Sequence, residues 1–148
     1  MKPTTFRIYT QRGRRRKLYY KVRIFPDVDK MREYWTNQGL RLSGMADSPD
    51  WEARATGWAA KYRLVKSRWK KSSCVGEVLF HAGNLGSGIV SHEMTHAAHY
   101  LLHRKWAHYN TPYRDEQLAW LQGWLVWQFW TNYYRLFPHQ TPVAMGAK

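Results

Sequence analysis

Alternating hydrophobic and polar positions predict two β-strands at the start of the chain. Thr5–Thr10 and Leu18–Phe25 are rich in Tyr, Ile, Val and Phe, which favour the pleated surface of a strand. The basic segment Gln11–Lys17 would join these strands as a hairpin loop. A short helix is then expected over residues 26–37, with Gly39 as its stop signal.

The middle of the chain predicts further strands and a second basic loop. Arg54–Val65 is expected to contain a strand, because Tyr62 and Leu64 alternate with polar neighbours. Lys66–Ser73 is interpreted as a loop. The apolar run Cys74–His81 predicts a strand, and we interpret it as an edge strand that leads into the next helix.

Helical spacing predicts the first of two long helices over residues 87–104. Val90, Met94, Ala97 and Leu101 recur at intervals of three or four residues and would form one buried stripe. Ser87, set between two glycines, is the expected N-cap of this helix.

A final helix is expected over residues 112–136. Thr111 followed by Pro112 is a good start signal, and Pro138 marks the end. The apolar stretch Leu118–Trp130 within it has only thirteen residues, which is too short to span a membrane. We therefore expect a core helix that is buried on both sides, and no association with a membrane.

This order of elements predicts one α+β domain over residues 1–148, with a small N-terminal sheet packed on the helices. A chain of this length suits one hydrophobic core. Residues 1–73 form a basic, β-rich half, and residues 74–148 carry the candidate chemistry.

The strongest chemical signal is the motif H-E-x-x-H, which runs from His92 to His96. Residues four apart share one face of a helix, so both imidazoles could bind one Zn²⁺. Glu93 lies beside the first histidine and would act as a general base on a water at that metal. Both histidines lie off the apolar stripe, so the helix can bury one side and present the imidazoles on another.

A catalytic zinc site needs a third protein ligand. Beyond Glu93, the only acidic residues are Asp115 and Glu116, at the start of the final helix. Glu116 is our expected third ligand, and Asp115 would support it. By helical phase Glu116 shares a face with Ala119 and Gly123, whose small side chains would allow a close approach to the motif helix. The alternative is that both acids only complement the helix dipole.

The motif and the order of its neighbours resemble the zincin peptidase fold. The segment from Cys74 to Phe137 is similar to minimal gluzincins of the ImmA/IrrE type and their phage-borne relatives, in which a Glu on the next helix completes the site. The spacing of Glu116 from His96 is similar to that pattern. This resemblance implies a small intracellular zinc protease whose substrate peptide lies along the strand before the motif helix, here Glu77–His81.

A second resemblance favours a different third ligand. The piece HEMTHA, residues 92–97, looks like SprT-like DNA-associated proteases, which use a third His after the motif. His108 is the residue that this resemblance offers, although Tyr109 follows it where that family has Gly. Three further residues are candidates for the cleft: His81 could line it, and Tyr109 or Tyr113 could stabilise the oxyanion.

The charge is large and uneven. The chain has a formal net charge of +14, and residues 1–71 hold 19 of the 24 basic and 6 of the 10 acidic residues. This half invites an anionic partner, either nucleic acid or an acidic protein. The candidate anion-binding residues are Arg12, Arg14, Arg15, Arg16, Lys17, Arg68, Lys70 and Lys71.

Cysteine content and the N-terminal segment indicate a cytoplasmic protein. Cys74 is the single cysteine, so no intramolecular disulfide can form, and its apolar neighbours favour a buried thiol over a nucleophile. The first residues lack the apolar core of a secretory signal. The sequence therefore predicts an intracellular zinc metalloprotease that acts on a protein substrate. The alternative is a non-enzymatic basic module that binds nucleic acid or protein on the same scaffold.

Overall fold

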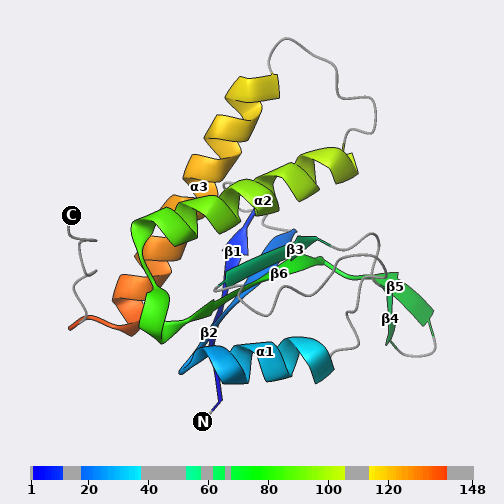
Figure 1. Cartoon of the computed structure of the whole chain (residues 1–148). Coiled ribbons are helices and arrows are strands. Elements are labelled where there is room, and N and C mark those ends of the chain that lie inside the picture. The colour runs from blue at the N-terminus through cyan, green and yellow to red at the C-terminus, as the bar shows by residue number, and fades with distance from the viewer. Residues whose placement is uncertain are drawn as a thin grey trace.

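The computed structural model describes residues 2–11, 18–37, 53–57, 62–65, 68–105 and 114–139. Within these ranges the chain forms six strands and three α-helices (Figure 1). In chain order they are β1 (Thr4–Tyr9), β2 (Tyr19–Phe25), α1 (Val28–Asn37), β3 (Ala53–Gly57), β4 (Tyr62–Val65), β5 (Arg68–Lys71), β6 (Cys74–His81), α2 (Ser87–Lys105) and α3 (Arg114–Leu136), with a short 3-10 turn, Ala82–Asn84, before α2.

Four of the strands form one sheet in the order β1-β2-β6-β3. β2 and β6 run parallel, while the β1-β2 and β3-β6 pairs are antiparallel. Helices α2 and α3 cover one face of this sheet, and α1 covers the other (Figure 1). The α+β architecture, with a motif helix and a long C-terminal helix, is as the sequence predicted.

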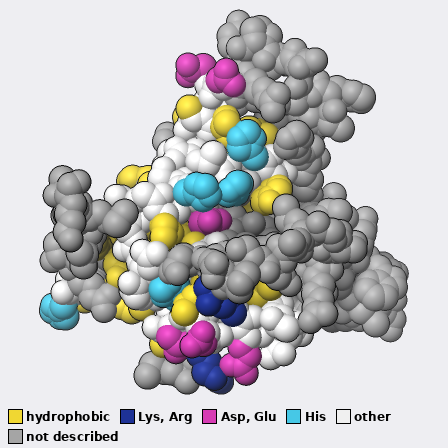
Figure 2. Space-filling model, in the orientation of Figure 1, with side chains coloured by type: hydrophobic (Ala, Val, Ile, Leu, Met, Phe, Trp, Pro, Cys, Tyr) yellow, Lys and Arg dark blue, Asp and Glu magenta, His cyan; other side chains and the backbone are white. Residues whose placement is uncertain are grey.

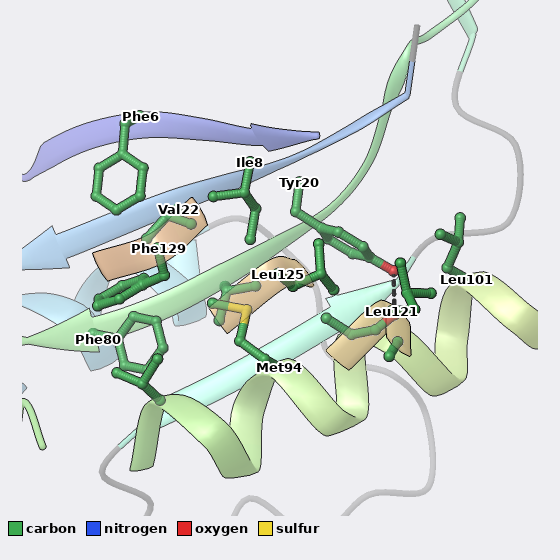
Figure 3. Close-up of a cluster of buried hydrophobic side chains, with 14 of the residues drawn as sticks. Phe6, Ile8, Tyr20, Val22, Phe80, Met94, Leu101, Leu121, Leu125 and Phe129 are labelled. Carbon is green, nitrogen blue, oxygen red and sulfur yellow. Dashed lines mark hydrogen bonds between the residues drawn. The ribbon is translucent and has the colours of Figure 1, made fainter. Parts of the chain in front are cut away.

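The main core lies between the sheet and the pair α2 and α3 (Figure 3). Phe129 of α3 packs its ring against Phe6 and Phe80, with ring centroids 5.6 and 5.1 Å apart. A smaller cluster fills the space beneath α1, and it consists of Phe25, Met31, Trp35 and Leu79. Because side chains alternate across a strand, β6 supplies Phe80 to the first core and Leu79 to the second.

Strand β6 is central, so our prediction of an edge strand was wrong. It pairs with β2 on one side and with β3 on the other. Both faces of β6 are also covered, which explains its nearly continuous apolar sequence, a pattern typical of interior strands. β3 forms the edge of the sheet beside α2.

The predicted loop Lys66–Ser73 was also wrong in part, because Arg68–Lys71 is strand β5. It pairs with β4 in a separate two-stranded sheet, in which Leu64 lies opposite Trp69. The segment Arg54–Val65 accordingly holds two strands, β3 and β4. Tyr62, Val65 and Trp69 have high intrinsic strand propensity, although the charge of the segment suggested a loop.

Helix α2 begins one residue away from the expected cap. The amide of Val90 donates to the carbonyl of Gly86 at 3.0 Å, so Gly86 takes the N-cap position and Ser87 is the first helical residue. Glycine is also accepted at this position.

Helix α3 is buried on one side only, which corrects the prediction of burial on both sides. Leu121, Leu125 and Phe129 are buried, whereas Trp120 and Trp127 on the opposite side are 50% and 58% exposed. Within the ranges that the structure describes, no helix is long and apolar enough to cross a membrane.

Side chains of α3 also form hydrogen bonds with backbone groups of β1, the strand at the outer edge of the sheet. The side-chain amide of Gln128 accepts a hydrogen bond from the amide of Tyr9 at 2.9 Å and donates one to its carbonyl at 2.6 Å. The indole of Trp124 donates to the same carbonyl at 2.9 Å. An edge strand leaves backbone groups unpaired, so these side chains replace part of a neighbouring strand.

Candidate metal centre

The two motif histidines converge on α2. His92 and His96 are exposed, and their Nε2 atoms lie 3.1 Å apart, with the rings nearly edge to face at 75°. Two nitrogens bound to one tetrahedral Zn²⁺ at about 2.0–2.1 Å would be about 3.3 Å apart. The pair therefore fits two neighbouring positions on one metal ion. Figure 2 shows histidine side chains gathered on the face of the molecule above α2.

Glu93 lies next to this pair but is largely shielded from solvent. Its exposed fraction is 8%, and Met94, the next residue, is fully buried. One step along a helix turns a side chain by about 100°, so Glu93 occupies the boundary between the exposed histidines and the core. A carboxylate that is largely shielded from solvent and adjacent to two exposed imidazoles is a candidate proton acceptor for chemistry at that site.

Contacts from two other elements position α2. The hydroxyl of Tyr20 on β2 donates to the carbonyl of Ala97 at 2.7 Å (Figure 3). On the α3 side, the amide of Gln122 donates to the hydroxyl of Ser91 at 2.7 Å. These bonds meet the helix directly before His92 and directly after His96, so both ends of the motif are connected to the scaffold.

The structure does not bring Glu116 to the two histidines. Asp115 and Glu116 are both exposed in the first turn of α3, and this end of the helix extends beyond α2 (Figure 1). Within the part of the chain that the structure describes, no group of three or more His, Cys, Asp or Glu could hold a metal ion. His108, the alternative third ligand, lies outside the described residues.

Glu116 does not reach the two histidines because of the rotation of α3 about its own axis. Leu121, Leu125 and Phe129 fix its buried side, and by helical phase Glu116 lies on the opposite side. Ala119 and Gly123, which we expected to face the motif helix, are exposed together with it. The residue of α3 that does contact α2 at the motif is Gln122.

The remaining candidates divide into two groups. His81 is buried at the end of β6, which fits packing better than lining an open cleft, while Tyr109 and Tyr113 lie outside the described residues. The basic residues of β5 are Arg68, Lys70 and Lys71. The first basic run lies outside the described residues, and it comprises Arg12, Arg14, Arg15, Arg16 and Lys17.

Sequence reasoning missed one aromatic residue next to the site. Tyr100 stacks on His96, with ring centroids 6.5 Å apart and an angle of 25° between the planes. It is 40% exposed. The sequence spacing could have indicated this contact, because Tyr100 lies four residues after His96 and both rings therefore share one face of the helix. The contributions of Tyr20 and Gln122 left no local signal, because each comes from a distant part of the chain.

A charged cluster on the other face of the sheet was missed as well. Glu77 of β6 is buried, pairs with Arg23 at 2.8 Å and accepts a hydrogen bond from the hydroxyl of Tyr34 at 2.8 Å. Burial, and then the bond to Glu77, raise the pKa of Tyr34 above its usual range. The cluster lies between the sheet and α1, on the opposite face of the sheet from α2, so it is separate from the motif histidines.

Comparison of the chain with models of protein families, with curated proteins and with solved structures found no match.

Proposed function

We propose that the protein is a zinc-dependent peptidase, and that His92, Glu93 and His96 form its catalytic centre. The observation that supports this proposal is the 3.1 Å separation of the two Nε2 atoms, together with the carboxylate between them in sequence. A structural zinc site would need the imidazoles but not the Glu. The proposed compartment is the cytoplasm, because Cys74 is the single cysteine and the chain does not depend on an intramolecular disulfide.

Each side chain has a defined task in this proposal. His92 and His96 provide two of the three protein ligands, and His108 is the candidate for the third, because Glu116 faces away from them. When bound, the ion lowers the pKa of a water to about 7 and polarises a carbonyl. Glu93 takes a proton from the attacking water and then gives it to the leaving amine.

The sheet offers a place for an extended substrate. β3 is the edge strand beside α2, and an edge strand can pair its outer backbone groups with an added peptide strand. A peptide on β3 would therefore run next to the motif helix. This arrangement replaces the substrate position that we first expected along Glu77–His81, which the central location of β6 rules out.

Metal analysis tests the first half of the proposal. We expect the purified protein to hold about one Zn²⁺ per chain, and His92→Ala or His96→Ala to remove it. His99→Ala is the matched control, since it removes a neighbouring histidine of α2 and should keep the ion. Full zinc content in both motif variants would exclude the site.

The catalytic half is tested by Glu93→Gln. This variant should retain zinc and the thermal stability of the native chain, because Glu93 is not a ligand. Cleavage of a peptide library, followed by mass spectrometry, should fall by at least the 10²–10⁴-fold that general acid–base catalysis contributes. Native protein that holds zinc but cleaves no peptide would instead favour the non-enzymatic binding module.

A further inference from the structure

The exposed side of α3 carries a row of tryptophan rings. Trp120 and Trp124 are nearly parallel, at 12° and 6.4 Å between centroids, and Trp124 and Trp127 follow at 16° and 5.1 Å. Trp120 and Trp127 are half exposed or more. Large aromatic rings dominate interface energetics, so a contiguous exposed row of them marks an interaction surface.

The row borders a shallow recess that is open to solvent. An open hollow of about 660 Å³ is lined by the three rings, Ala119 and Gly123. A Cβ atom on Gly123 would meet nothing within 4 Å, so the absent side chain leaves space between the rings. Planar groups can enter such a space and stack on the indoles.

The net charge of the chain indicates which kind of planar ligand would suit the recess. The chain carries a net charge of +14, which favours a polyanion. The indole of Trp124 donates to the carbonyl of Tyr9 at 2.9 Å, and in the sequence Arg12, the first residue of the basic run, follows Tyr9 by only three positions. Aromatic platforms combined with positive charge are the features that bind single-stranded nucleic acid without sequence preference.

A membrane surface fits these observations less well. A helix that lies in a lipid interface has a polar face rich in Lys and Arg. Among the described side chains of α3, Asp115 and Glu116 are acidic and Arg135 is the basic one. These side chains do not form the basic face of an interfacial helix, so single-stranded nucleic acid, whose flat bases can stack on the indoles, fits the row better than a lipid surface.

We propose that the recess formed by Trp120, Gly123, Trp124 and Trp127 binds single-stranded nucleic acid by stacking on its bases. This site is separate from the metal centre and does not depend on the proposed peptidase activity. It would let the protein stay attached to a nucleic acid while its motif helix remains accessible.

The test measures binding of the full-length protein to a fluorescein-labelled twenty-nucleotide oligothymidylate by anisotropy. Trp120→Ala and Trp127→Ala should each weaken binding about tenfold or more, since stacking is lost. Gly123→Leu should weaken it similarly by filling the recess, without loss of helix, because Leu is the better helix former. Leu136→Ala, which removes an exposed apolar side chain of the same helix, should bind like the native chain.

The salt dependence of the affinity distinguishes base stacking from contacts with phosphate groups. The two tryptophan variants should keep the native dependence of affinity on salt, because no phosphate contact is removed. The proposal is overturned if all three recess variants bind as tightly as the native chain, or if polyphosphate of equal charge competes as well as the oligonucleotide. Preferential binding to phosphatidylserine vesicles, lost in Trp127→Ala, would overturn it in favour of a lipid surface.

Discussion

The hydroxyl of Tyr20 donates a 2.7 Å hydrogen bond to the carbonyl of Ala97, the residue directly after His96. Tyr20 is fully buried on β2, and the two residues are 77 positions apart in the chain. This bond connects the centre of the sheet to the helix that carries both candidate zinc ligands. A shift of α2 against the sheet would therefore break a buried hydrogen bond.

Tyr20→Phe should lower the free energy of unfolding by about 1 kcal/mol, the usual net value of one buried hydrogen bond. The ring and its packing are kept, so the effect isolates the hydroxyl. Urea denaturation of the variant measures it. Tyr134→Phe, in an exposed position on α3, should leave the midpoint unchanged. Equal midpoints for Tyr20→Phe and the native chain would show that the bond contributes nothing.

The third zinc ligand can be identified from two single variants. Because Glu116 is exposed on the side of α3 opposite Leu125, Glu116→Ala should leave zinc content unchanged, as should its neighbour Asp115→Ala. His108→Ala should lower zinc retention during dialysis against a chelator. The reverse result would mean that α3 turns its first residues toward the motif when the ion binds, as in the gluzincin arrangement expected from the sequence.

Cys74 should react slowly with alkylating reagents in the folded protein. Burial raises the pKa of its thiol, and the group donates a hydrogen bond to the carbonyl of Gly76 at 3.3 Å. Since the thiolate is the reactive form, iodoacetamide should modify the native chain more slowly than the urea-unfolded chain at the same mildly alkaline pH. Equal rates would contradict the assignment of a shielded thiol.

The raised pKa of the Cys74 thiol also makes the stability of the folded protein depend on pH. A raised pKa in the folded state means that ionisation of the thiol opposes folding. The contribution of Cys74 is complete below the pKa of the unfolded thiol and is lost as the pH rises toward the folded value. Cys74→Ala should remove this part of the alkaline destabilisation, which urea denaturation at neutral and alkaline pH would measure.

The basic run between β1 and β2 should govern the salt dependence of nucleic-acid binding. Replacing Arg14, Arg15 and Arg16 by Ala should reduce the slope of log affinity against log salt by about two to three units, at 0.7–0.9 per phosphate contact. Anisotropy titrations at several salt concentrations measure the slope. Zinc content should not change. An unaltered slope would assign these arginines to solubility or to an acidic protein partner.

Local sequence determined the elements whose stability depends on near neighbours. The apolar spacing from Val90 to Leu101 specified the motif helix, and alternation specified β1 and β2 nearly to the residue. The convergence of His92 and His96 was predictable for the same reason, because two side chains four apart on a helix meet whatever surrounds them. Strand Cys74–His81 was confirmed with its predicted limits.

Tertiary structure decided what lies beside each element. The pairing of β6 with both β2 and β3 depends on contacts between distant segments, so its apolar pattern alone did not distinguish a central strand from an edge. Helix α3 is apolar around most of its circumference, and hydrophobicity therefore left its rotation undetermined. Packing of Leu121, Leu125 and Phe129 against the sheet selected one rotation, and that selection turned Glu116 and the tryptophan row to solvent.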